Sequence, residues 1–351
     1  MEEKTQDNTQ LNNKNGIFQY LKIGFLIVLV AFAFIFLLGK VSEKITAYAD
    51  NYYRNYFLNE EPGFSAPWYV KGLHKVDEAF IYNLSKDYNP HVFLIGSSVS
   101  SNSIDADTVS LNENYTYKAL VCGNGCYRSN RIFINMGEKA GLFTDKDIIK
   151  YEVSFSTFRD SEKTITETVL DKWGKYSVNE DLTINENSLL KSPLYRINVE
   201  LIKIQNVWEI FTSWWEQTNH PDRYPLPRGY ANFKNNYFNY DAVADSCHFT
   251  EEYAESVLKD IDELNDKYVE VVEISPLPQG LLNTDYGQLV NEFIDNELIP
   301  HLDKKGIRYR DLRNAFEDRE FADGVHLSYE AEVKYTNELN DYMNDVISEI
   351  N

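Results

Sequence analysis

The sequence predicts an α/β domain built on a parallel β-sheet and preceded by a single transmembrane helix. Short apolar segments alternate with helical segments from about residue 90 onward, and such alternation is typical of a parallel sheet covered on both faces. A long uncharged segment lies close to the N-terminus. The 351 residues are 43% hydrophobic and 14% aromatic, which is the composition of a globular protein.

The N-terminal segments predict a membrane anchor. Residues 1–16 are rich in Asn, Gln, Lys and Glu, so we expect a disordered cytoplasmic tail. The run Ile23–Gly39 carries no charge, and counted from Ile17 it is long enough to cross a bilayer core of about 30 Å at about 1.5 Å per residue. We therefore predict a transmembrane anchor over residues 17–39.

The orientation of this anchor rests on architecture, because lysines flank the apolar run on both sides. A short polar tail, one apolar span and a long following domain are typical of an uncleaved signal anchor. This arrangement predicts a single-pass protein of the cell membrane whose domain lies outside the cell. A cleaved signal peptide is the alternative, since Ala47-Tyr48-Ala49 resembles a cleavage site. About ten residues, including charged ones, separate that site from the apolar run, and we favour the anchor.

The remaining elements follow in order. Residues 40–88 are expected to form a membrane-proximal helical linker, and residues 89–351 the α/β domain. The predicted strands are His91–Gly96, Tyr117–Cys122, Asp147–Phe155, Val269–Ser275 and Ile307–Asp311. The predicted helices are Arg128–Ala140, Tyr195–Glu216, Thr250–Lys267, Gln288–Lys304 and Ser328–Ile347.

A stretch over residues 160–247 interrupts this alternation and is interpreted as an insertion. Its segment Asn219–Tyr240 is rich in proline and aromatic residues, and long irregular insertions are often lids or binding loops. We expect this segment to cover the carboxyl edge of the sheet as a lid. The alternative is that it packs on the far side and only covers apolar sheet surface.

Charge, cysteine and histidine content exclude several functions. With 34 basic and 55 acidic residues the net charge is −21, so nucleic acid is not an expected partner. The six histidines show no metal-ligand spacing, so no metal site or other cofactor is expected. Cys122, Cys126 and Cys247 do not form a disulfide framework. They are either buried thiols or, in an extracytoplasmic domain, include one disulfide.

Two short motifs at opposite ends of the domain indicate a nucleophile site. The first predicted strand ends in Gly96-Ser97-Ser98, where a hydroxyl can lie exposed at the carboxyl end of the strand. Asp323 precedes His326 by three residues, just before the last helix. A serine hydroxyl needs a base to accept its proton and a third group to hold that base, and these residues supply both. The alternative is an ordinary turn and a surface histidine.

These two motifs resemble the first and last sequence blocks of the SGNH (GDSL-like) hydrolase superfamily. More narrowly they resemble its membrane-anchored branch, which includes the teichoic-acid D-alanylation protein DltD and polysaccharide O-acetylation proteins. The resemblance covers roughly residues 90–347 and the N-terminal span. It implies a flavodoxin-like three-layer parallel sheet, with Ser98 as nucleophile, His326 as base and Asp323 as the acid of the triad.

The resemblance departs from the family pattern in its middle blocks. The second block of the family supplies a glycine N–H to the oxyanion hole. Here Gly123 or Gly125 would serve beside the N–H of Ser98, with Asn124 as a side-chain donor; the alternative is that these glycines only form a tight turn. The Gly-x-Asn-Asp of the third block is missing, and loss of one oxyanion donor costs about 2.7–4 kcal/mol unless it is replaced.

The expected substrate is an acyl group on a cell-surface polysaccharide or teichoic-acid-like polymer. Arg223, Tyr224, Arg228 and Tyr230 of the predicted lid are candidate substrate-binding residues, because the arginines offset the acidic surface and the rings can stack on sugars. Trp208, Trp214 and Trp215 could extend that platform. The function expected is a serine esterase or O-acyltransferase. Its rival is a catalytically silent binding or scaffold protein that partners a multi-span membrane acyltransferase.

Overall fold

A computed structural model gives the structure of the chain. It describes residues 3–60, 76–104, 109–122, 125–159, 176–186, 193–219, 240–245, 247–321 and 324–351.

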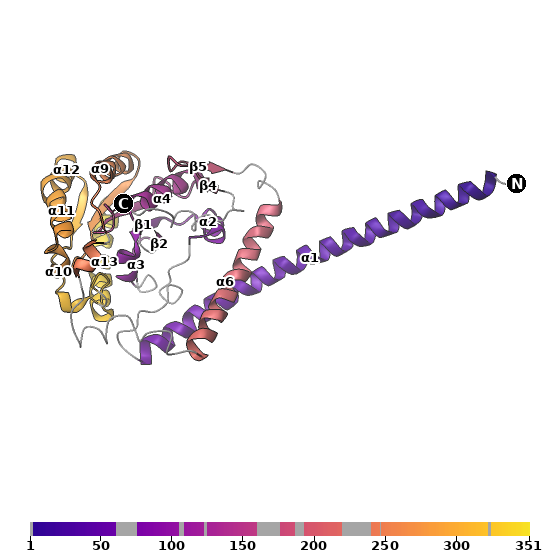
Figure 1. Cartoon of the computed structure of the whole chain (residues 1–351), viewed down its shortest axis with the longest axis horizontal. Helices are drawn as coiled ribbons and strands as arrows, with labels where there is room; N and C mark the ends of the chain where they lie inside the picture. The colour runs from indigo at the N-terminus through magenta and orange to yellow at the C-terminus, as the bar shows by residue number, and fades with distance from the viewer. Residues whose placement is uncertain are drawn as a thin grey trace.

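A five-stranded parallel sheet forms the centre of the domain (Figure 1). Its strands are β1 (His91–Ser97), β2 (Thr116–Cys122), β3 (Ile148–Val153), β6 (Val269–Ile274) and β7 (Arg308–Asp311). The order β2-β1-β3-β6-β7 is the flavodoxin-like order, with the chain reversing direction across the sheet between β1 and β3. The predicted α/β class is therefore confirmed.

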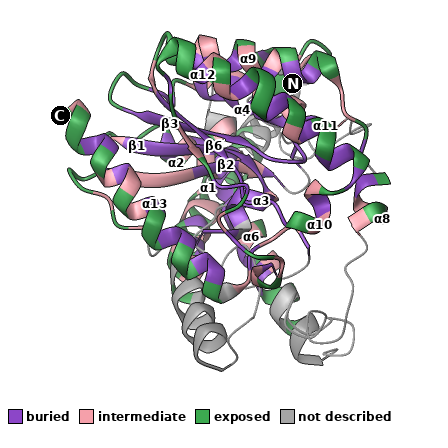
Figure 2. Cartoon of the chain, turned by 90° about the vertical axis from the view of Figure 1, so that its left-hand side faces the viewer, coloured by how far each residue is buried: buried purple, intermediate pink, exposed green. Residues whose placement is uncertain are grey.

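Helices cover both faces of the sheet and enclose two cores. One face packs against α4 (Tyr127–Ala140), α9 (Glu251–Asn265), α11 (Asp285–Phe293) and α12 (Ile299–Lys305). The other packs against α13 (Tyr329–Ile350). Buried residues concentrate in the strands and on the inward sides of the helices, while the outward sides are exposed (Figure 2). Every residue of β1 is buried, as expected for a central strand of a parallel sheet.

The helix predicted over Gln288–Lys304 begins earlier and is interrupted. The hydroxyl of Thr284 accepts a hydrogen bond from the N–H of Gly287 at 3.1 Å, and this N-cap starts α11 at Asp285. A single π-helical turn, Ile294–Leu298, separates α11 from α12. Sequence periodicity alone does not reveal such a turn, because it shifts the helix by only one residue.

Helix α1 (Glu3–Glu60) carries the predicted anchor and projects from the domain (Figure 1). Its segment Phe18–Thr46 contains an 18-residue window with a mean hydropathy of 2.9, and no residue of that window is buried. In the described part of the chain this is the one helix long and apolar enough to cross a membrane. The helix also includes residues 3–16, which we predicted to be disordered. It has no proline, so no residue in it blocks helix propagation from the apolar span.

The predicted linker over residues 40–88 differs from the structure at both ends. Helix α1 continues without a break to Glu60. Helix α2 (Glu78–Leu84) belongs to the domain itself, because Ala79, Ile81 and Leu84 are buried in its cores. The domain therefore begins before residue 89.

Helix α6 (Pro193–Asn219), which includes the predicted helix Tyr195–Glu216, connects the anchor helix to the domain (Figure 1). On one side the ammonium of Lys203 lies between the carboxylates of Glu43 on α1 and Glu200 on α6. On the other side Asn206 donates a hydrogen bond of 2.9 Å to Asp77, the N-cap of α2. These contacts fix the domain relative to the end of the apolar span.

The insertion also contains a small hairpin that the sequence did not predict. Strands β4 (Tyr176–Val178) and β5 (Ile184–Glu186) pair antiparallel. Leu182 in the connecting turn has φ 65°. Strands of only three residues are too short for an alternating pattern to be recognised. The short helix α8 (Tyr240–Asp245) follows the segment 220–239, which lies outside the described residues.

The three cysteines are buried free thiols, so the alternative of a disulfide among them is not realised in the structure.

A buried carboxylate on β6 predicts a pH-dependent stability. Glu270 is 2% exposed, and both its oxygens lack a hydrogen-bond partner among the described residues. Burial, and then the charges of Asp260 and Asp262, raise the pKa of the Glu270 carboxyl well above its usual range. Because folding raises this pKa, the protonated side chain contributes its full stability to the folded state at pH values below the pKa of the unfolded chain, about 4.3. That contribution is lost as the pH rises toward the folded pKa.

We expect Glu270→Gln to raise the free energy of unfolding at pH 8 relative to the native chain, because the variant need not keep a proton on this side chain. The gain is about 1.4 kcal/mol for each unit by which folding raises the pKa, and it disappears near pH 4. Denaturant unfolding of the full chain in detergent at both pH values measures it. Glu255→Gln, on the exposed side of α9, is the matched control. An equal effect at pH 4 and pH 8 would contradict the account.

Candidate active site

The first candidate residue lies where β1 ends and a short helix begins. Ser97 is the last residue of β1, and Ser98 is the first residue of α3 (Ser98–Asn102). Ser97 caps this helix, since its hydroxyl accepts a hydrogen bond of 3.1 Å from the N–H of Val99. The two adjacent serines therefore differ: Ser97 is 3% exposed and points into the turn, whereas Ser98 is half-buried. Only the Ser98 hydroxyl is accessible for chemistry.

The second candidate residue lies in the loop before α13. An isolated antiparallel bridge between Phe321 and Leu327 closes this loop, and both side chains are buried in the core under α13. Gly324 has φ 84°, a left-handed conformation that favours glycine, so the Asp-Gly sequence matches the turn. Ser328 ends the loop as the N-cap of α13. His326 therefore lies within the loop that this bridge closes, two residues before the N-cap of α13.

These elements bring the two side chains together. Nε2 of His326 lies 3.1 Å from Oγ of Ser98, although 228 residues separate them in sequence. This is hydrogen-bond distance for a base that accepts a proton from a nucleophile. Both side chains are half-buried. It lies next to the reversal between β1 and β3, which is the usual position of sites in this class of sheet.

The third predicted member of the triad, Asp323, lies outside the described residues. Its role as the group that orients His326 stays a prediction from the sequence.

The structure removes one of the predicted oxyanion donors. The N–H of Gly125 donates to the carbonyl of Cys122 at 3.2 Å, and is therefore engaged within the turn after β2. Gly125 still lies close to the site, because a Cβ added to it would meet Cα and Cβ of Ser97 at 3.0 Å. Gly123 and Asn124 lie outside the described residues and remain predicted donors. The N–H of Ser98 is at the first position of α3, where helix N–H groups have no acceptor within the helix.

The turn after β3 occupies the position of the missing asparagine block. The hydroxyls of Ser154 and Ser156 bond to each other, with their oxygens 2.9 Å apart. The hydroxyl of Thr157 accepts a hydrogen bond of 2.9 Å from the N–H of Ser154. All three side chains are buried. The turn is thus a compact hydroxyl cluster that also anchors α4, because Tyr127 donates its N–H to the carbonyl of Thr157 at 2.8 Å.

Cys122 is a poorer candidate nucleophile than Ser98. It ends β2, beside the end of β1. Burial raises the pKa of its thiol to about 11. The thiolate is the reactive form of cysteine, and it is scarce at neutral pH when the pKa is this high. Among the described residues no group of three or more His, Cys, Asp and Glu side chains is placed to hold a metal ion.

The predicted substrate-binding residues are not placed by the structure. Arg223, Tyr224, Arg228 and Tyr230 lie outside the described residues, as does the predicted lid apart from its ends. Trp208 and Trp215 are 67% and 61% exposed on α6, the helix that packs on α1 and α2 rather than on the edge of the sheet. The side chain of Trp214 lies outside the described part of the structure.

Sequence reasoning missed one residue at the site, the buried Glu152 of β3. Its Oε1 accepts hydrogen bonds from the hydroxyls of Ser97 at 3.0 Å and Ser275 at 3.1 Å. The N–H of Ser97 also donates to its other oxygen. The sequence carried a signal for it, because a glutamate stands in a predicted strand of a sheet expected to be covered on both faces. Charged side chains are rarely buried without a partner.

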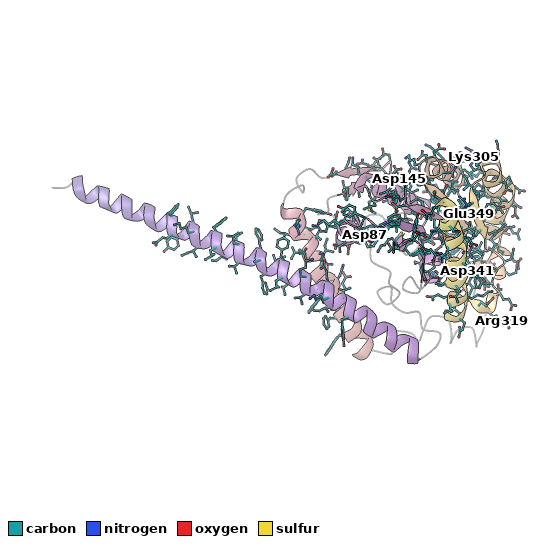
Figure 3. The ribbon with its side chains drawn as sticks, turned by 180° about the vertical axis from the view of Figure 1, so that it is seen from behind. Asp87, Asp145, Lys305, Arg319, Asp341 and Glu349 are labelled. Carbon is teal, nitrogen blue, oxygen red and sulfur yellow. The ribbon has the colours of Figure 1, made fainter. Side chains whose placement is uncertain are left out.

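The charged side chains elsewhere lie mainly on the outer surface of the domain. Figure 3 shows this for Asp145, Asp341 and Glu349, which are all exposed. Basic side chains such as Lys305 and Arg319 are interspersed with them.

Comparison with known proteins gives a distant structural similarity. No protein-family model matches the chain, and no curated protein matches its sequence. Among solved structures, one similar chain is a "putative acylhydrolase" from Bacteroides fragilis. It shares 8% sequence identity with a TM-score of 0.41, over 76% of this chain and 95% of the other.

Proposed function

We propose that this protein is a membrane-anchored serine esterase or O-acyltransferase of SGNH-like type. The observation that carries the proposal is the 3.1 Å contact between Ser98 Oγ and His326 Nε2 at the carboxyl edge of a parallel sheet. A histidine at this distance can accept the serine proton as the hydroxyl attacks a carbonyl. The predicted Asp323, on the same loop as His326, would hold the imidazole and favour its protonated form.

The reaction we infer is a double displacement. Ser98 Oγ attacks the acyl carbonyl, and its proton moves to Nε2 of His326. The resulting oxyanion accepts hydrogen bonds from the N–H of Ser98 and from Gly123, with Asn124 as a further donor. When this intermediate collapses, His326 returns the proton to the leaving alcohol and the acyl group stays on Ser98. A second hydroxyl, from a sugar or from water, then attacks the acyl-enzyme with His326 again as base. The bond between the acyl carbon and Ser98 Oγ breaks, and His326 returns the proton to that oxygen.

The proposed setting is the outer face of a membrane. Helix α1 supplies one apolar span, and α6 ties the domain to the end of that span. A site held close to a membrane suits substrates attached to the cell surface. We therefore propose a polysaccharide or teichoic-acid-like polymer as substrate, and a multi-span membrane acyltransferase as a partner that delivers the acyl group. The motif resemblance to the DltD-like branch supports the same proposal.

Turnover of a small neutral ester tests this function. The full chain in detergent is expected to hydrolyse p-nitrophenyl acetate, and Ser98→Ala is expected to lower the rate by at least about a thousandfold. Adding a soluble oligosaccharide separates transfer from hydrolysis, because a transferase forms an acetylated sugar. The matched control is Ser110→Ala, at a position between β1 and β2 that does not touch the Ser98–His326 pair. Equal rates for Ser98→Ala and the native chain would contradict the proposal.

A further inference from the structure

Glu152 lies fully buried directly beneath the turn that presents Ser98. It belongs to β3, the strand beside β1, and its side chain is 0% exposed. Its carboxylate accepts hydrogen bonds from both the N–H and the hydroxyl of Ser97. Ser275, just after β6, donates a third hydrogen bond at 3.1 Å. One carboxylate thus ties together the carboxyl ends of three strands.

The backbone around the nucleophile is shaped to admit this carboxylate. A Cβ added to Gly96 would lie 2.0 Å from Oε2 of Glu152, so the strand can approach only because residue 96 is glycine. The hydroxyl of Ser97 accepts from the N–H of Val99 while donating to Glu152, and it therefore links the carboxylate to the first turn of α3. Ser98 is the residue between these two fixed points.

Retention of a carboxylate here carries a cost in stability. A buried charge is unfavourable unless hydrogen bonds or an opposite charge compensate it. Among the described ion pairs none includes Glu152, and its hydrogen-bond donors are serines. Lys150, two residues earlier on β3 and also buried, interacts with it electrostatically. Hydrogen bonds to an ionised acceptor are shorter and stronger than those between neutral groups, so this carboxylate fixes the turn more firmly than a neutral side chain would.

We propose that Glu152 is a positioning residue that holds the Ser97–Ser98 turn so that Ser98 Oγ faces His326. This inference rests on the proposed function. Glu152 acts through Ser97 and does not touch the reacting atoms. Its role is to restrict the orientations of Ser98, since a misplacement of about 1 Å in a reacting group can cost about a hundredfold in rate.

The test is the rate at which a fluorophosphonate probe labels Ser98 in the full chain, measured per folded molecule. Glu152→Gln keeps the size of the side chain but removes its charge and one of its two acceptors. We expect it to lower the labelling rate and kcat by about 10- to 100-fold, with KM for a small ester almost unchanged. Glu255→Gln, on the exposed side of α9, makes the same change away from the site and is expected to leave both rates unchanged.

A purely structural role for Glu152 predicts a different pattern. In that case Glu152→Gln would lower the melting temperature while the folded fraction reacted at the native rate, and this would overturn the proposal. Combination with Ser97→Ala adds a second criterion. If Glu152 acts through Ser97, the labelling rate of the double variant should be little lower than that of the slower single variant. A rate reduced by the product of the two single-variant factors, as for independent sites, would contradict the inference.

Two further outcomes are distinguishable. If Glu152→Gln does not fold, Ser97→Ala and Ser97→Thr carry the test, because threonine keeps the hydroxyl that bonds to Glu152 and alanine removes it. Alanine should then react at least about fivefold more slowly than threonine, and equal rates would overturn the proposal. If the native chain does not react at all, the proposed function itself fails, and this inference falls with it.

Discussion

Replacing His326 by alanine is expected to lower ester turnover by at least about a thousandfold without unfolding the protein. The imidazole is the only described base in contact with the Ser98 hydroxyl, at 3.1 Å, and it is half-buried at the edge of the domain rather than part of a core. Without it the hydroxyl must lose its proton to water, which makes serine a poor nucleophile at neutral pH.

The matched control for this prediction is His248→Ala, because His248 is an exposed histidine of the same domain. It should leave turnover and the melting temperature unchanged. Combining His326→Ala with Ser98→Ala should add little to either loss, since the two side chains act as one unit. A His326→Ala variant that retained a tenth of the native rate would show that another group takes the serine proton.

Gly96→Ala is expected to lower the free energy of unfolding by about 3 kcal/mol, because the new methyl group would overlap a buried side chain. Its Cβ would lie 2.0 Å from Oε2 and 2.7 Å from Cβ of Glu152. The carboxylate cannot move aside easily, since Ser97 and Ser275 hold it by hydrogen bonds. Denaturant titration of the full chain in detergent measures the loss.

Two comparisons isolate the overlap with Glu152. Gly306→Ala introduces a methyl group where no atom lies within 4 Å, and its cost comes only from the left-handed backbone conformation at φ 67°, about 1 kcal/mol. In a Glu152→Ala background the overlap with Oε2 no longer exists and only the 2.7 Å contact with Cβ of residue 152 remains, so Gly96→Ala should cost less there. If Gly96→Ala destabilises no more than Gly306→Ala does, the packing account of this turn is wrong.

The fold was largely predictable from the sequence because its strands and helices carry strong local signals. The buried parallel strand His91–Ser97 appears as a continuous apolar run ending in Gly-Ser-Ser. Helix α13 begins at a serine N-cap followed by glutamates, as expected for a helix start. The parallel sheet was predicted from the alternation of strands and helices, and its flavodoxin-like arrangement from the resemblance.

Features that depend on packing between distant segments were not predictable. The contact of α6 with both α1 and α2 depends on a few polar pairs, such as Lys203 with Glu43, whose sequence positions carry no periodic signal. The same holds for the site. Ser98 and His326 were predicted from motifs, whereas the contact of Glu152 with Ser97 depends on β3 lying beside β1. Gly125 was predicted as an oxyanion donor, but its N–H donates to the carbonyl of Cys122 within the turn, which the sequence does not reveal.

The most direct test of the central claim is to find which residue a fluorophosphonate probe modifies in the full-length protein in detergent. Digestion and mass spectrometry locate the adduct on the peptide that contains both Ser97 and Ser98. The account predicts an adduct on the Ser98 oxygen, absent from His326→Ala and unaffected by His248→Ala. An unmodified chain, or an adduct on Ser97 or another residue, would contradict the proposal that Ser98 and His326 form a nucleophile and its base.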